Sequence, residues 1–179
     1  MKKALKYLGI TILVLIAIPL ILGLFVSKDF MYEKSISINS PIDSVWTHVS
    51  TLAAIDGWSP WNDYDPSMKK EMTGTDGEIG ASHSWESPHE KVGKGSQTIS
   101  KIEKPVLIET DLKFYVPYES EAKGYIKLAP EGEGTKVTWG FSSVMPYPFN
   151  VMSLFMDMSE MMDPDFTKGL AKLKDLCEN

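Results

Sequence analysis

The pattern of hydrophobic and polar residues divides the chain into a long apolar run, a series of short alternating segments and a final stretch with helical spacing. The apolar run, residues 7–26, contains no charged side chain. A helix of about 20 residues, rising about 1.5 Å per residue, crosses the roughly 30 Å hydrocarbon core of a bilayer. Pro19 fits this reading because transmembrane helices tolerate proline as a kink. The run therefore predicts a transmembrane anchor within residues 1–28, followed by one domain at 29–179.

Charges on the two sides of the run predict its orientation. Three lysines precede it, whereas Lys28 and Asp29 begin a region of mixed sign. The positive-inside tendency places such an N-terminus in the cytoplasm and the domain outside it, as in a single-pass protein of the cell membrane. The alternative is a cleaved signal peptide, whose apolar region usually has about 7 to 15 residues and ends in small residues. Here the run is longer and ends in Leu24, Phe25 and Val26, which favours a retained anchor.

Alternation with a period of two predicts a β-rich domain after the anchor. Residues 32–39 alternate as a half-buried strand, and Ser40 with Pro41 begins a helix that should reach about Ser50. Residues 52–66 are interrupted by Gly and Pro, which predicts a connecting segment with short helical turns at most. Turn-forming residues then separate roughly six further strands, near 68–72, 79–86, 92–102, 107–115, 120–128 and 135–143. Short consecutive strands with tight connections are typical of an antiparallel meander.

The last part of the chain changes to helical spacing. After residues 145–148, apolar side chains recur three or four positions apart up to Cys177, with Pro164 expected to kink or divide the helix. The stripe comprises Met152, Phe155, Met156, Ser159, Met162, Phe166, Leu170, Leu173 and Cys177. A long amphipathic helix that follows a curved sheet buries its stripe on the concave face of that sheet. The pattern therefore predicts an α+β domain in which a sheet wraps around a C-terminal helix.

Composition excludes some classes of partner. The formal charge is -6, and all 18 basic side chains are lysines. Nucleic-acid binding needs basic patches and favours arginine, so we expect no nucleic-acid partner. Cys177 is the only cysteine, so no internal disulfide can form.

Several short motifs together resemble a known superfamily. They are Trp58-Ser59-Pro60-Trp61 with Asp65-Pro66, Gly80-Ala81 with Trp85, Gly93 and Gly95 with Ile102 and Pro105, Leu112-Lys113-Phe114 with Pro117, Gly134 to Trp139, Leu154 to Asp157, and Pro164 to Leu170. This set is similar to the START-related SRPBCC superfamily, which includes proteins labelled polyketide cyclase/dehydrase. The resemblance implies a helix-grip, Bet v 1-like fold with an apolar pocket between helix and sheet. Members of the superfamily place lipids, polyketides, hormones or aromatic compounds in that pocket.

The expected cavity combines aromatic residues of the sheet and loops with methionines of the last helix. Its predicted lining is Trp58, Trp61, His83, Trp85, Leu112, Phe114, Trp139, Met145, Met152, Phe155, Met156 and Ser159. Methionines give an adaptable surface for irregular apolar ligands, although the same stripe could fill a closed core. Trp58 and Trp61 either gate the cavity or, as we favour, close one end of the barrel.

Catalytic signatures are sparse. His83 alternates with Ala81 and Trp85 and should point inward, and Asp157 lies beside the methionine stripe, which makes these two residues weak candidates for proton transfer. The three histidines have no spacing typical of a metal site, and we expect no cofactor. We interpret the chain as a membrane-anchored binding protein for a small hydrophobic molecule or lipid. The alternatives are a cyclase- or hydratase-type enzyme that uses the same cavity, and a cell-envelope interaction module without a ligand.

Overall fold

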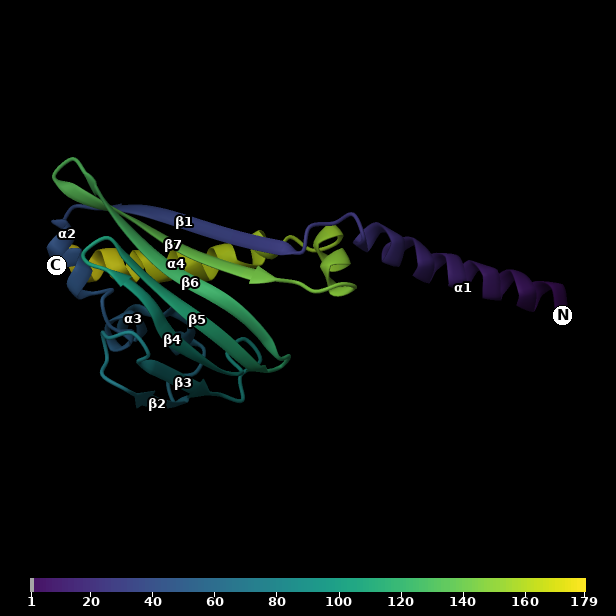
Figure 1. The fold of residues 1–179 in the computed structure, drawn as a ribbon, viewed down its shortest axis with the longest axis horizontal. Helices are drawn as coiled ribbons and strands as arrows, with labels where there is room; N and C mark the ends of the chain where they lie inside the picture. Colours follow the sequence, from purple (N-terminus) through teal and green to yellow (C-terminus); the bar gives the residue numbers. More distant parts are fainter. Residues whose placement is uncertain (1) are drawn as a thin grey trace. The chain divides into compact units, whose positions relative to one another are not determined.

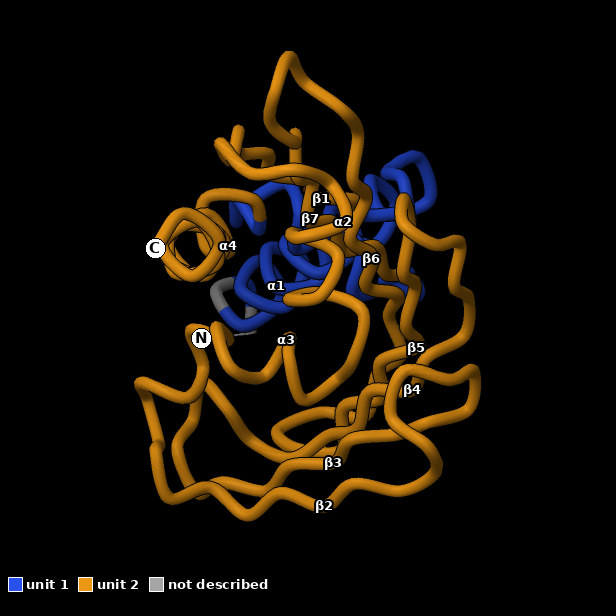
Figure 2. Tube along the Cα trace, turned by 90° about the vertical axis from the view of Figure 1, so that its left-hand side faces the viewer, with its two compact units in different colours: residues 1–30, 144–158 blue, residues 31–143, 159–179 orange. Residues whose placement is uncertain are grey.

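The computed structural model describes residues 2–179, which fall into two compact units (Figure 2). Unit 1 combines the residues up to Phe30 with Val144–Met158. Unit 2 combines Met31–Ser143 with Ser159–Asn179. The larger of the two, unit 2, holds most of the sheet and nearly all of the C-terminal helix.

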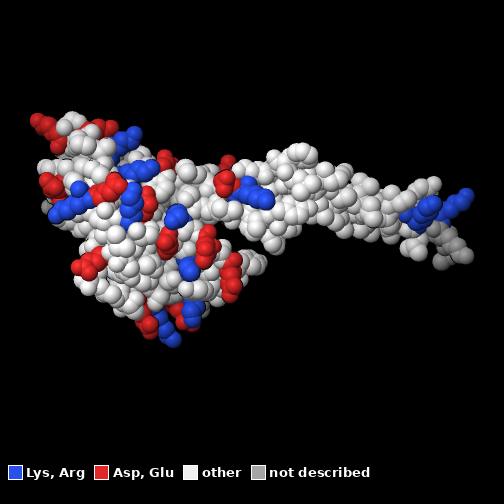
Figure 3. All heavy atoms as spheres, in the orientation of Figure 1, with Lys and Arg blue, Asp and Glu red and all other residues white. Residues whose placement is uncertain are grey.

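Unit 1 contains the apolar helix α1 (Lys2–Gly23) and the short 3-10 helix η2 (Phe149–Leu154). Within residues 2–179, the part from Leu5 to Gly23 is the one helical segment long and apolar enough to cross a membrane. Its surface shows a long uncharged, white stretch in Figure 3. A signal sequence near an N-terminus has the same length and composition. The apolar N-terminal helix is therefore compatible with a membrane anchor and with a signal sequence.

One curved antiparallel sheet forms the main layer of the domain (Figure 1). Its strands are β1 (Asp29–Ile38), β2 (Lys69–Thr73), β3 (Ser82–Glu86), β4 (Lys94–Glu103), β5 (Leu107–Val116), β6 (Ser120–Glu131) and β7 (Gly134–Val144). They are ordered β1-β7-β6-β5-β4-β3-β2, so every strand from β2 to β7 lies beside its neighbour in sequence. The predicted meander is therefore confirmed, with strand ends displaced by up to a few residues.

Two helices and a 3-10 turn connect β1 to β2. The first, α2 (Ile42–Thr47), is shorter than expected, and α3 (Leu52–Trp58) with η1 (Pro60–Asp63) occupies the segment for which only short turns were expected. The Thr51 side chain caps α3 by accepting a hydrogen bond from the Ala54 amide at 3.1 Å. The Asp76 carboxylate accepts hydrogen bonds from the amides of Leu52 and Ala53, at 2.7 and 2.9 Å. Because Asp76 lies more than 20 residues after these amides, the residues next to α3 do not predict this second cap.

The C-terminal helix α4 (Met158–Glu178) begins later than the apolar spacing predicted. It continues through Pro164, so of the two expected outcomes, a kink or a division, the division does not occur. The predicted first turns of the helix instead form η2 in unit 1. The Asn150 side chain explains the difference, since it donates hydrogen bonds to the carbonyls of Gly23 and Val26 and so ties this segment to the end of α1.

The core of unit 2 lies between α4 and the sheet. Phe166, Leu170 and Leu173 of α4 are buried there together with apolar side chains of α2, α3 and most strands. Phe166 stacks on Trp139 of β7, with ring centroids 4.1 Å apart. This packing fixes the helix over the sheet at one end, and the space that remains between them is the candidate site.

Candidate ligand cavity

Unit 2 encloses a cavity of about 280 Å³ between α3, η1, the strands β3 to β7 and α4. Its lining is mainly aromatic and aliphatic, with a few polar groups among them. Most of the apolar lining comes from Leu52, Ile55, Trp58, Trp61, Trp85, Ile108, Leu112, Phe114, Ile126, Trp139, Phe141, Met162 and Phe166. A concave apolar site with few polar groups is the usual form of a small-molecule binding pocket.

Three tryptophan rings form a cluster in the lining of the cavity. Trp58 and Trp61 both meet Trp139 edge to face, with ring centroids 4.9 and 5.7 Å apart. Trp58 is fully buried, and its indole N–H donates to the His48 carbonyl at 3.0 Å. These contacts hold the ring in place, so Trp58 forms a wall of the cavity. This arrangement favours the role of closing the barrel over that of a gate.

Three side chains from adjacent strands form a row across the sheet. His83 of β3 pairs in register with Gln97 of β4, which pairs with Leu112 of β5. The Gln97 side-chain amide donates to the Thr110 hydroxyl at 2.9 Å, and that hydroxyl lies 3.3 Å from the Gly124 carbonyl. His83, Gln97 and Thr110 therefore place hydrogen-bonding groups on an otherwise apolar wall of the cavity.

His83 is the titratable group among these side chains, and it is largely buried. Only 8% of its surface is exposed. Burial of the imidazole lowers the pKa of His83 below its ordinary value, and the nearby Lys70 charge acts in the same direction, against the opposing effects of Asp56 and Asp76. His83 is consequently neutral near pH 7, a state in which the ring both donates and accepts hydrogen bonds.

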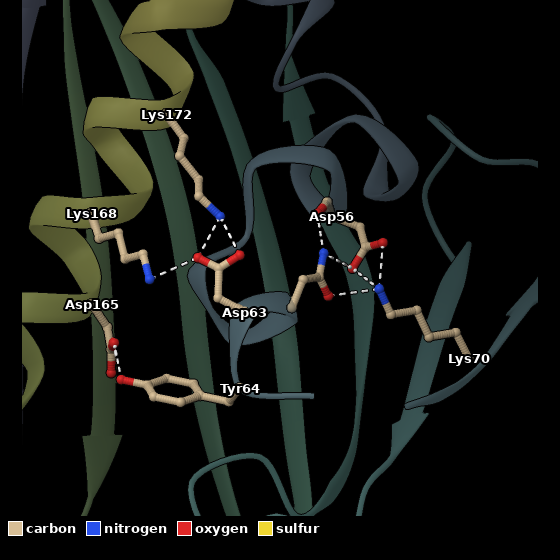
Figure 4. Close-up of polar contacts among 8 residues, drawn as sticks. Asp56, Asp63, Tyr64, Lys70, Asp165, Lys168 and Lys172 are labelled. Carbon is tan, nitrogen blue, oxygen red and sulfur yellow. Dashed lines mark hydrogen bonds and ion pairs between the residues drawn. The ribbon is translucent and has the colours of Figure 1, made fainter. Parts of the chain in front are cut away.

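Ionic contacts hold the loop that carries Trp61 (Figure 4). The Asp63 carboxylate of η1 binds the ammonium groups of Lys168 and Lys172 on α4 at 2.8 and 2.7 Å, and these contacts lower its pKa. The next residue, Tyr64, donates from its hydroxyl to Asp165 of α4 at 2.7 Å. Exposed ion pairs add little to stability, so these contacts mainly fix where η1 lies against α4.

A second contact of the same loop involves β2. Lys70 binds both carboxylate oxygens of Asp56 at 2.9 and 2.8 Å and the side-chain carbonyl of Asn62 at 2.7 Å (Figure 4). Asp56 and Asn62 both line the cavity. The cavity carboxylate is thus already neutralised by a lysine.

Gly95 of β4 makes room for the ring of Trp85, which forms another part of the cavity wall. A Cβ atom at Gly95 would lie only 2.4 Å from Cζ2 of Trp85, closer than real contacts allow. The Trp85 indole N–H donates to the Val92 carbonyl at 3.2 Å, and its ring meets Phe114 edge to face at 6.1 Å. Gly95 is therefore required for the close approach of this ring to β4.

Seven of the twelve residues that the sequence predicted to line the cavity do so in the structure. Trp58, Trp61, His83, Trp85, Leu112, Phe114 and Trp139 all line the cavity. The other five are not among its lining residues: Met145, Met152, Phe155 and Met156 belong to unit 1, and Ser159 lies in the first turn of α4. The stripe was expected to include Met152, Phe155 and Met156 in the C-terminal helix, but α4 begins only at Met158.

The two candidates for proton transfer belong to different units. His83 lines the cavity, whereas Asp157 is an exposed residue of unit 1.

The sequence did not predict that Gln97 lines the cavity, because a polar residue on a strand is usually assigned to the solvent face. Gln97 lies two residues from both Gly95 and Ile99, and residues two apart on a strand point to the same face. This spacing is the signal that could have placed the Gln97 side chain on the inner face.

A sheet that curves around one long C-terminal helix and leaves a cavity between them is the helix-grip fold, as predicted. Residues 30–178 match the family described as polyketide cyclase / dehydrase and lipid transport. The chain belongs to this family, which confirms the resemblance seen in the sequence.

Solved structures share the fold at low sequence identity. A Nitrosospira multiformis protein is 20% identical, with a TM-score of 0.60 over 82% of this chain and 94% of that one. A point mutant of norcoclaurine synthase from Thalictrum flavum, in complex with a transition-state analogue, is 14% identical, with a TM-score of 0.63 over 83% and 94%. A Chromobacterium violaceum protein is 14% identical, with a TM-score of 0.58 over 85% and 98%. No curated protein matches the chain in sequence.

Burial of His83 leads to a prediction about pH. As the pH falls through about 6.5, the unfolded chain binds a proton at this histidine before the folded protein does, because the folded-state pKa is lower. The folded state should therefore lose stability from pH 7 toward pH 5. We expect the His83→Gln variant to lose less stability over this interval, as measured by urea unfolding of the full chain in lipid nanodiscs. Equal losses in both proteins would contradict the prediction.

Proposed function

We propose that the chain is a membrane-anchored binding protein for a small hydrophobic or lipid ligand held in the cavity of unit 2. The observation that carries this proposal is the cavity of about 280 Å³, lined by aromatic and aliphatic side chains around a few polar groups. The family, whose description includes lipid transport, is consistent with it.

The lining also suggests the chemistry of the ligand. A largely apolar body suits the wall formed by Ile108, Ile126 and Phe141. His83 and Gln97 lie side by side in register on the same wall and offer hydrogen bonds to one polar group. A ligand with an apolar ring or chain and a single hydroxyl, carbonyl or similar group therefore suits this cavity best.

Membrane attachment is the second part of the proposal. In it, α1 remains attached as a single transmembrane span through residues 7–26, with the N-terminus in the cytoplasm and the domain of residues 29–179 outside. The apolar length of α1 and the three lysines in its first two turns, which precede the uncharged run of residues 7–26, support this topology.

The enzyme alternative has weaker support. General acid–base catalysis in the cavity would need a proton-transfer partner for His83, and the Asp56 carboxylate is bound by Lys70. The proposal therefore assigns His83 a hydrogen bond to the ligand, with no covalent chemistry.

Native mass spectrometry of the full chain, extracted in mild detergent, tests the proposed function. We expect an apolar molecule to leave with the folded protein and to be released only on unfolding or strong activation. Preparations that carry no such molecule, and that take up no apolar fluorescent probe, would contradict the proposal. They would favour an interaction module without a ligand.

A further inference from the structure

Residues 144–156, which we call the apolar segment, expose an unusual amount of hydrophobic surface for a connection between a strand and a helix. They contain no charged side chain. Phe155 is 73% exposed and Phe149 is 63% exposed. The other exposed large hydrophobic residues of the segment are Val144, Tyr147, Met152, Leu154 and Met156. Exposed apolar side chains gathered in one short segment are typical of an interaction site.

Hydrogen bonds fix this segment to the end of α1 within unit 1. The Asn150 side chain is fully buried, and its Nδ2 atom donates to the carbonyls of Gly23 at 2.7 Å and Val26 at 3.0 Å. The Met145 amide donates to the Lys28 carbonyl at 2.8 Å. The last carbonyls of a helix have no partner within the helix, so Asn150 supplies a donor to the Gly23 carbonyl at the end of α1.

The length of α1 gives the depth at which these contacts lie if the helix spans a bilayer. Its 19-residue apolar part, Leu5–Gly23, is about 28 Å long, close to the roughly 30 Å hydrocarbon core. The carbonyls that Asn150 binds are therefore at the boundary between the acyl chains and the headgroups. Leu24 and Phe25, which are also exposed, extend the apolar surface of α1 up to the same level, and Lys28 follows them.

The backbone of the apolar segment suits such an environment. Pro146 and Pro148 have no amide hydrogen that would need a partner. The Phe149 amide donates to the Pro146 carbonyl at 2.8 Å, and the Phe155 amide donates to the Met152 carbonyl at 2.9 Å. Internal hydrogen bonds and missing donors lower the free-energy cost of moving a backbone into the interface.

We propose that the apolar segment is a second membrane-contact site, with its exposed side chains inserted into the lipid leaflet at which α1 ends. Its occupant is the bilayer itself, because the segment continues the apolar surface of α1 and carries no charge that would recognise a particular protein. This inference rests on the proposed membrane anchoring by α1. It adds an interfacial site to the transmembrane one and so fixes unit 1 to the membrane by two elements.

The depth of single fluorescent labels tests this proposal in the full chain. The Phe155→Cys change is made in a Cys177→Ser background, labelled with an NBD fluorophore and placed in phosphatidylcholine nanodiscs. Leu13→Cys, near the middle of α1, serves as the control for membrane insertion, and Glu131→Cys, exposed at the β6–β7 turn, as the control for water. Nanodiscs that contain lipids with a nitroxide near the headgroup or deep in the acyl chain report the depth of each label.

We expect the label on the Phe155→Cys variant to emit at shorter wavelength than the label on Glu131→Cys and to be quenched more by the shallow nitroxide than by the deep one. The label on Leu13→Cys should show the opposite order. The Phe149→Cys variant should give the same result as Phe155→Cys, and Asn150→Ala should weaken quenching at residue 155 without changing it at residue 13.

Other outcomes separate the two proposals. A label at residue 155 that resembles Glu131→Cys, or that is shielded from water but not quenched by lipid, would overturn the second contact while α1 remains a membrane span. The shielded case would indicate cover by protein, including a second copy of the chain. An unquenched label at residue 13 would overturn membrane anchoring and the present inference together.

Discussion

Replacing Leu112 by Trp should abolish uptake of an apolar probe while the protein remains folded. Leu112 lies on β5, is half-buried and lines the cavity beside Gln97. A larger ring at this position occupies volume that a ligand would fill. Overpacking a core typically costs about 1 to 3 kcal/mol, and a void of about 280 Å³ can absorb part of the ring. Uptake can be measured by equilibrium dialysis of the probe against nanodiscs with and without the protein.

The matched control is Lys113→Trp, which adds the same ring one residue further along β5. Lys113 is exposed, because successive side chains of a strand point to opposite faces. Its contact with Glu121 is an exposed ion pair whose loss should change stability little. We expect this variant to take up the probe normally. If Leu112→Trp also took up the probe as well as Lys113→Trp does, the binding site would lie outside the cavity.

Most strands were predictable because alternation of polar and apolar residues is a local property of the sequence. The inward positions of His83, Trp85, Leu112 and Phe114 followed from the same alternation, and all four line the cavity. The start of α4 did not follow, because apolar spacing cannot distinguish a helix from an apolar segment held elsewhere. Here Asn150 forms hydrogen bonds with residues more than 120 positions earlier.

The polar contacts that position the cavity walls were also beyond sequence reasoning. Asp76 caps α3 from outside the helix, and Asp63 of η1 binds Lys168 and Lys172 of α4. Each of these charged side chains is, taken alone, an ordinary surface residue. Which partner an acidic or basic side chain meets depends on the folded backbone, so composition and spacing do not determine the contacts.

Replacing Trp139 by Ala should strongly destabilise unit 2. Its ring stacks on Phe166 at 4.1 Å and meets Trp58 and Trp61 edge to face. It also fills the space beside Gly169, where a Cβ atom would lie 2.7 Å from its Cζ3. Removing a buried Trp typically costs about 3 to 5 kcal/mol of unfolding free energy. Urea unfolding of the full chain in nanodiscs, followed by far-UV circular dichroism, measures this loss.

Two further variants show whether the loss reflects this aromatic cluster. Tyr118→Ala removes a ring that is 81% exposed, so the unfolding free energy should change by no more than about 0.5 kcal/mol. Trp139→Phe keeps an aromatic ring against Phe166 and should lose clearly less than the alanine variant, because a smaller void remains. If Trp139→Ala cost as little as Tyr118→Ala, the ring would not join α4 to the sheet.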